Sequence, residues 1–128
     1  MWKDIVKGCD YVMHVASPVF TYTPKDQNKI LNSAIDGTKN VLMACVENKI
    51  KKVVLTSSVS AIRHCSKKGH IYSESDFTDE NFISLYPRSK VLAEKEAWKI
   101  ANQHNLNLTV ICPSLILGEY LLDNYTAS

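Results

Sequence analysis

Three short apolar runs, each ending in small polar residues, constrain the fold of this 128-residue chain more than any other feature. Two segments with the apolar spacing of amphipathic helices separate them, at about 27–48 and 87–104. The run Val53–Leu55 does not alternate with polar residues, which is typical of parallel strands covered on both faces. Strand, helix, strand, helix, strand is the order of two successive βαβ units. The sequence therefore predicts an α/β fold with a parallel sheet and right-handed crossovers.

The ends of the three predicted strands carry small polar side chains. Ligands of parallel sheets bind beyond the carboxyl ends of the strands, which all reach the same edge. Taken one at a time, these Ser and Pro residues are explained as strand stoppers. Taken together they predict a binding site at that edge, formed by Ala16 and Ser17, Ser57 and Ser58, and Pro113 and Ser114.

The segment YPRSKVLAEKEAW places Tyr86 and Lys90 four residues apart at the start of the second predicted helix. Residues at this spacing lie on one helix face. An ammonium group beside a phenol favours the phenolate, so the pair can exchange a proton with a carbonyl or alcohol oxygen. The spacing alone is weak evidence, because a partly buried Tyr beside a solvated Lys also satisfies it. Its place next to the predicted strand ends favours the catalytic interpretation.

Composition and charge exclude several classes of protein. Hydrophobic residues make up 45% of the chain and charged residues 22%, as in ordinary globular domains. A net charge of +2 with scattered lysines gives no reason to expect nucleic acid or an acidic membrane as a partner. No apolar run is long enough to span a membrane and MWKDIVKGCD lacks a signal-peptide core, so we expect a cytoplasmic protein. The four Cys and four His residues lack metal-ligand spacing, and we expect no metal site.

Five segments, in order, resemble the extended short-chain dehydrogenase/reductase superfamily: GCDYVMHVASPV, GTKNVLMAC, KKVVLTSSVSAI, YPRSKVLAEKEAW and LTVICPSLILG. They are most similar to its dihydroflavonol reductase and cinnamoyl-CoA reductase-like branch, from about residue 5 to 118. The resemblance implies a Rossmann-like, doubly wound parallel sheet. Residues 1–128 would form the second half of the dinucleotide-binding domain, which carries the catalytic segment, with no second domain.

The resemblance also implies catalytic roles for individual residues. Tyr86 would donate the proton to the substrate carbonyl. Lys90 would hydrogen-bond the nicotinamide ribose and stabilise the ionised form of Tyr86. Ser58, with Ser57 as the alternative, would hold the substrate oxygen and stabilise developing charge.

The implied cofactor is NADP or NAD, and NADP is favoured by the family resemblance alone. Besides Tyr86 and Lys90, the strand ends would bind it. Ala16 and Ser17 match the stretch that lines the ribose and phosphate side. The family's hydride comes from the nicotinamide. Pro113 and Ser114 match the backbone that approaches this ring. The implied partner is a small-molecule carbonyl or alcohol substrate.

The sequence departs from the family at its beginning. Relatives start with a strand and a GxxGxxG loop that holds the pyrophosphate on a helix N-terminus. The four glycines of this chain are not clustered, and the similarity opens at the family's fourth strand. We therefore expect the catalytic middle of a larger fold. One sheet edge and two apolar faces would be uncovered, and the chain could associate with itself through that edge.

The leading hypothesis is a segment of an NAD(P)-dependent oxidoreductase of the carbonyl reductase or alcohol dehydrogenase type. A sugar-nucleotide epimerase or dehydratase uses the same Tyr–Lys pair and is an alternative, although HVASPV and SSVSAI favour the reductases. A further alternative is a truncated, non-catalytic chain that needs a partner to fold. Binding of a nicotinamide cofactor distinguishes the enzymes from this last alternative.

Overall fold

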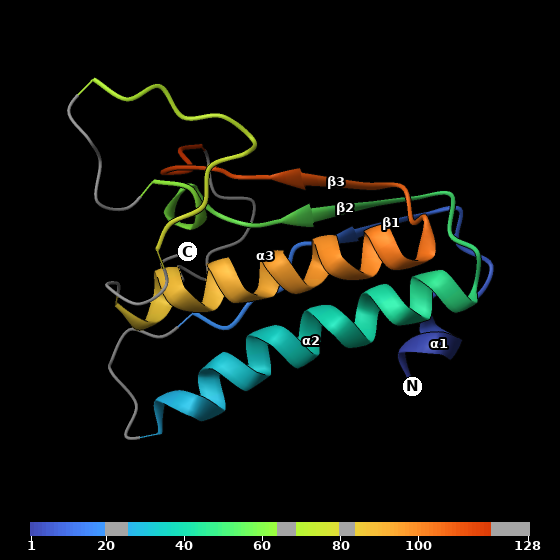
Figure 1. The fold of residues 1–128 in the computed structure, drawn as a ribbon. Helices are drawn as coiled ribbons and strands as arrows, with labels where there is room; N and C mark the ends of the chain where they lie inside the picture. Colours follow the sequence, from blue (N-terminus) through green and yellow to red (C-terminus); the bar gives the residue numbers. More distant parts are fainter. Residues whose placement is uncertain (20–25, 64–68, 80–83, 119–128) are drawn as a thin grey trace.

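The computed structural model contains a three-stranded sheet and two long helices in two layers (Figure 1). It describes residues 1–19, 26–63, 69–79 and 84–118. The elements follow one another in the order α1 (Trp2–Ile5), β1 (Tyr11–His14), α2 (Gln27–Glu47), β2 (Lys52–Thr56), the 3-10 helix η1 (Val59–Ala61), α3 (Leu85–His104) and β3 (Leu108–Ile111). The predicted alternation of three strands with two long helices is confirmed.

The sheet is parallel throughout, with the strand order β1-β2-β3. His14 is in register with Leu55, and Leu55 with Val110. Because neighbouring strands are aligned in this way, their carboxyl ends reach the same edge of the sheet. The predicted parallel α/β arrangement is therefore confirmed, and the edge where a ligand was expected exists.

Both long helices cover the same face of the sheet and lie side by side there (Figure 1). Successive right-handed crossovers in one direction place their helices on one face, so one half of a doubly wound sheet has this arrangement. α2 begins after Asp26, whose carboxylate accepts a hydrogen bond from the backbone N–H of Lys29 at 3.2 Å. α3 begins two residues earlier than predicted, and Pro87 sits in its first turn, where a missing N–H has no cost.

The core lies between the helices and this face of the sheet. Val53 and Leu55 alternate along β2 with half-buried neighbours and point toward the helices. They pack with fully buried residues of both helices, among them Leu42, Cys45 and Ala97. This packing fixes α3 against β2, and so it fixes the start of α3 relative to the strand ends.

The opposite face of the sheet is uncovered in the described part of the chain. Its apolar side chains are largely exposed, namely Tyr11 (66%), Met13 (72%) and Ile111 (48%). The expectation of a sheet covered on both faces is thus met on one face only. Two apolar faces were expected to be uncovered, and the described residues show one of them, the face of the sheet opposite the helices. None of the helices in the described ranges combines the length and apolarity needed to cross a membrane.

Candidate active site

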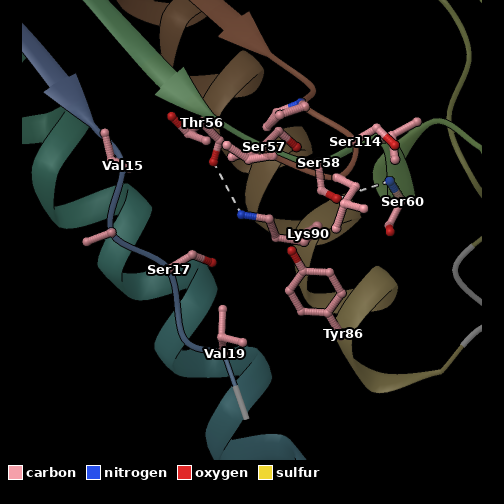
Figure 2. A pocket seen from close by; sticks show the side chains of 15 residues that line it. Val15, Ser17, Val19, Thr56, Ser57, Ser58, Ser60, Tyr86, Lys90 and Ser114 are labelled. Carbon is pink, nitrogen blue, oxygen red and sulfur yellow. Dashed lines mark hydrogen bonds between the residues drawn. The ribbon is translucent and has the colours of Figure 1, made fainter. Parts of the chain in front are cut away.

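A cleft of about 650 Å³ opens at the carboxyl ends of the three strands (Figure 2). The first turns of α3 form its other wall. All the candidate residues from the sequence line this one cleft: Ala16, Ser17, Ser57, Ser58, Tyr86, Lys90, Pro113 and Ser114. The structure thus brings together every predicted site residue, while their individual roles stay predictions.

The strand ends are held in place by hydrogen bonds that continue the β2–β3 ladder. The Ser57 N–H donates to the Ile111 carbonyl at 2.8 Å, and the Val59 N–H donates to the Pro113 carbonyl at 2.9 Å. Ser58 lies between them in extended conformation and caps η1, since its hydroxyl oxygen accepts the Ser60 N–H at 3.2 Å. The serine and the Pro113 backbone are therefore positioned by one rigid substructure.

Lys90 is buried at the base of the cleft, with 5% of its surface exposed. Its ammonium group donates to the Thr56 carbonyl at 3.2 Å, which the dashed line in Figure 2 marks. Burial lowers the pKa of Lys90, whereas Cys112 and the carboxylate of Glu94 act in the opposite direction. A lysine held in such a place costs stability, which favours a functional role.

Tyr86 lies one turn before Lys90 and is 40% exposed. Figure 2 shows its hydroxyl pointing toward the Lys90 side chain inside the cleft. The first turn of α3 is tightened by Ser89, whose hydroxyl donates to the Tyr86 carbonyl at 2.8 Å. The phenol therefore has access to the cleft, and its hydroxyl group is directed toward the Lys90 side chain.

Hydrogen bonding separates the two candidate serines. The Ser57 hydroxyl is buried and donates to Glu94 Oε2 at 2.5 Å. The Ser58 oxygen accepts a backbone N–H, so its own hydrogen is available to a ligand in the cleft. Of the two alternatives, the geometry favours Ser58 as the donor to a substrate oxygen.

Sequence reasoning did not single out Glu94 or His14. Glu94 is one turn beyond Lys90, so the spacing places it on the same helix face, although it does not show that the carboxylate is buried. His14 ends β1 on the helix side of the sheet. Burial and the charge of Lys90 lower the pKa of His14, which keeps its imidazole neutral near pH 7.

Within the described residues, no group of three His, Cys, Asp or Glu side chains could hold a metal ion.

Comparison with known proteins identifies the family. Residues 2–124 match the 3-beta hydroxysteroid dehydrogenase/isomerase family, and the chain belongs to this family. It is 38% identical over 133 residues to an anthocyanidin reductase ((2S)-flavan-3-ol-forming) of Vitis vinifera, covering 96% of this chain and 39% of that protein. It is 35% identical over 128 residues to a cinnamoyl-CoA reductase of Medicago truncatula, covering 94% and 39%. The resemblance to the dihydroflavonol reductase and cinnamoyl-CoA reductase-like branch is confirmed.

The fold of a relative of known structure agrees with this family assignment. The yeast methylglyoxal/isovaleraldehyde reductase, determined in complex with NADPH, superimposes with a TM-score of 0.80 at 26% identity. The match covers 95% of this chain and 41% of that protein. The Rossmann-like class of the fold is thereby confirmed. The chain spans about two fifths of the length of the relatives it matches.

Proposed function

We propose that this chain carries the catalytic segment of an NAD(P)-dependent oxidoreductase that interconverts a small carbonyl compound and its alcohol. The observation that carries the proposal is the convergence of Tyr86, Lys90 and Ser58 on one cleft at the strand ends. Membership in a family whose matched relatives are named reductases supports it.

Each of the three side chains has a distinct part in the proposed reaction. Tyr86 donates its proton to the carbonyl oxygen of the substrate during reduction. The ammonium group of Lys90 stabilises the phenolate that remains. The Ser58 hydroxyl donates a hydrogen bond to the same substrate oxygen, where negative charge develops. In alcohol oxidation the proton moves back to Tyr86.

The cleft fits a nicotinamide cofactor, which supplies or accepts the hydride when bound. Small side chains in the segment after β1, Ala16 and Ser17, let a sugar and phosphate approach the backbone there. On the other side, Pro113 and Ser114 form the wall next to Ser58. The Lys90 ammonium group is a donor for a ribose hydroxyl. NADP is proposed over NAD because the yeast relative was determined with NADPH.

The test is cofactor-dependent turnover by the protein isolated at the length its source cells make. We expect oxidation of NADPH that depends on an added carbonyl compound and is faster than oxidation of NADH. Methylglyoxal, isovaleraldehyde and cinnamoyl-CoA are suitable first probes, and UDP-glucose tests the epimerase alternative. Isomerisation of UDP-glucose without net oxidation would replace the proposal with that alternative. Failure to bind any nicotinamide cofactor would instead favour a non-catalytic chain.

A matched pair of variants tests the serine assignment. Ser58→Ala should lower kcat by about 10²- to 10³-fold, as loss of one donor to a developing oxyanion does. Ser57→Ala should cause a smaller loss, because its hydroxyl bonds Glu94 rather than facing the cleft. Steady-state kinetics of both variants decide the point. The opposite ranking would transfer the substrate contact to Ser57.

A further inference from the structure

Glu94 holds a buried carboxylate beneath the cleft, where none of the proposed reaction steps requires one. Only 5% of the residue is exposed. Its oxygens accept from three donors: the Ser57 hydroxyl at 2.5 Å, the Trp98 indole N–H at 3.3 Å and the Cys112 thiol at 3.7 Å. A carboxylate is costly to bury unless it is satisfied in this way. Its donors come from α3 itself and from the segments that follow β2 and β3.

Two of these donors immediately precede proposed site residues. Ser57 is followed by Ser58, and Cys112 is followed by Pro113. The same carboxylate belongs to α3, the helix that carries Tyr86 and Lys90. One side chain therefore bonds to both strand ends and to the helix that opposes them.

We propose that Glu94 is a positioning residue of the active site, a role that rests on the proposed function. Its carboxylate ties the ends of β2 and β3 to α3, and so it sets the separation of Ser58 and Pro113 from Tyr86 and Lys90. Glu94 itself touches neither substrate nor cofactor. Rates of catalysed reactions are sensitive to such separations, since a shift of about 1 Å can cost about 100-fold.

The charge of Glu94 has a second effect on the same site. Burial lowers the pKa of Lys90, and the negative charge one turn away counteracts this. Glu94 thus helps to keep Lys90 protonated in the pH range in which the proposed reaction needs its charge. A side chain at position 94 with neither charge nor oxygen acceptor, such as methionine, would remove both the strand tether and this support, whereas glutamine removes the charge and one of the two acceptor oxygens.

The experiment compares Glu94→Gln with Glu96→Gln in the protein at its native length. Glu96 lies on the same helix and forms a surface ion pair with Lys99 at 3.3 Å, so its variant makes the same charge change away from the cleft. Glu94→Gln should lower kcat for carbonyl reduction by about 10- to 100-fold, with KM for the carbonyl nearly unchanged. Glu96→Gln should leave both constants unchanged.

A readout independent of turnover comes from Cys112. This thiol is half-buried, and with Glu94 it borders a second cavity of about 310 Å³, through which a small alkylating reagent can reach it. Burial and the charge of Glu94 raise the pKa of Cys112. In Glu94→Gln the midpoint of its alkylation by iodoacetamide should therefore move to lower pH. Peptide mass spectrometry separates Cys112 from the other cysteines, and a uniform rate increase without a midpoint shift would instead indicate loosening of the fold.

The two readouts distinguish the possible failures. A shifted Cys112 midpoint with a reduced kcat is the expected result. A shifted midpoint with wild-type kcat would overturn the positioning role and leave the reductase function standing. An unshifted midpoint would show that the Glu94–Cys112 contact does not persist in solution, which also overturns the inference. An inactive wild-type protein would overturn the proposed function, and the positioning role with it.

Further variants keep the test decisive should Glu94→Gln fold poorly. Glu94→Asp retains the charge but draws it back by one methylene, so we expect little change in the Cys112 midpoint together with a reduced kcat. The double variant Ser57→Ala/Glu94→Met should be no slower than Glu94→Met, because Glu94→Met already breaks the hydrogen bond that Ser57→Ala breaks. Additive losses would show that the two residues act independently and would overturn the tether through Ser57.

Discussion

Replacing Tyr86 by phenylalanine is expected to lower kcat for carbonyl reduction by about 10²- to 10⁴-fold, the usual contribution of one positioned acid or base. Phenylalanine keeps the ring and its packing at the start of α3 and removes only the hydroxyl group that points toward Lys90. Cofactor affinity should be largely unaffected, because the lysine and the strand ends remain. Stopped-flow or steady-state kinetics, with cofactor binding followed by fluorescence, measure both quantities on the same sample.

Tyr11→Phe is the matched control. Tyr11 lies on the uncovered face of the sheet with 66% of its surface exposed, so its variant loses a phenol hydroxyl outside the cleft. Its kinetics should equal those of the wild type. Full activity in Tyr86→Phe would mean that another group supplies the proton, and the assignment of the catalytic acid would have to be abandoned.

The strands and helices were predictable because their apolar patterns differ in period and length. Val53–Leu55 is an unbroken run with a polar end, and α2 shows its apolar face over 21 residues. The element boundaries agree with the sequence to within two residues, and the start of α3 differs because Pro87 fits inside the first turn as well as at its first position. Parallel pairing followed from the order of the elements, since a helix between two strands returns the chain to the same end of the sheet.

The sequence also located the cleft, but it could not show which buried side chains hold the walls of the cleft in position. Tyr86 and Lys90 stand out by spacing, and the strand ends by their change in polarity. Glu94 looks like one of several charged residues in VLAEKEAW until α3 is packed against the sheet. Its burial depends on contacts with Ser57 and Cys112, which are 37 and 18 residues away in the chain. No local pattern encodes contacts of that range.

The choice between the two candidate serines also depended on contacts that the sequence does not show. TSSVSAI offers adjacent hydroxyls with equal chemistry, and a resemblance alone favoured Ser58. Successive residues of an extended segment point to opposite sides. The structure directs Ser57 toward α3 and Glu94, and it leaves the Ser58 hydrogen available to the cleft. This direction follows from the alternation along β2, in which Val53 and Leu55 face the helices and Ser57 continues on the same side.

Lys90→Met should have the second large effect, on cofactor affinity as well as on rate. Methionine has a similar length without the charge. A hydrogen bond from a charged donor contributes about 1.5–3 kcal/mol, so its loss should raise the Kd for the nicotinamide cofactor by about 10- to 100-fold. The kcat should fall as well, because the Tyr86 phenolate loses its neighbouring cation. Lys99→Met, which removes an exposed ammonium paired with Glu96, is the control and should change neither constant.

Stability distinguishes this functional role of Lys90 from a structural one. Because burial lowers the pKa of Lys90 below the ordinary 10.5, the unfolded chain binds more protons than the folded one as the pH passes between the two values. The free energy of unfolding of the wild type should therefore gain a contribution as the pH rises through that window. Lys90→Met should lack this rise and should be at least as stable at pH 7, since it buries no charge and water in the cleft can reach Thr56. Urea unfolding at several pH values measures both effects. A large loss of stability at pH 7 with unchanged cofactor affinity would show that Lys90 serves the fold instead of the reaction.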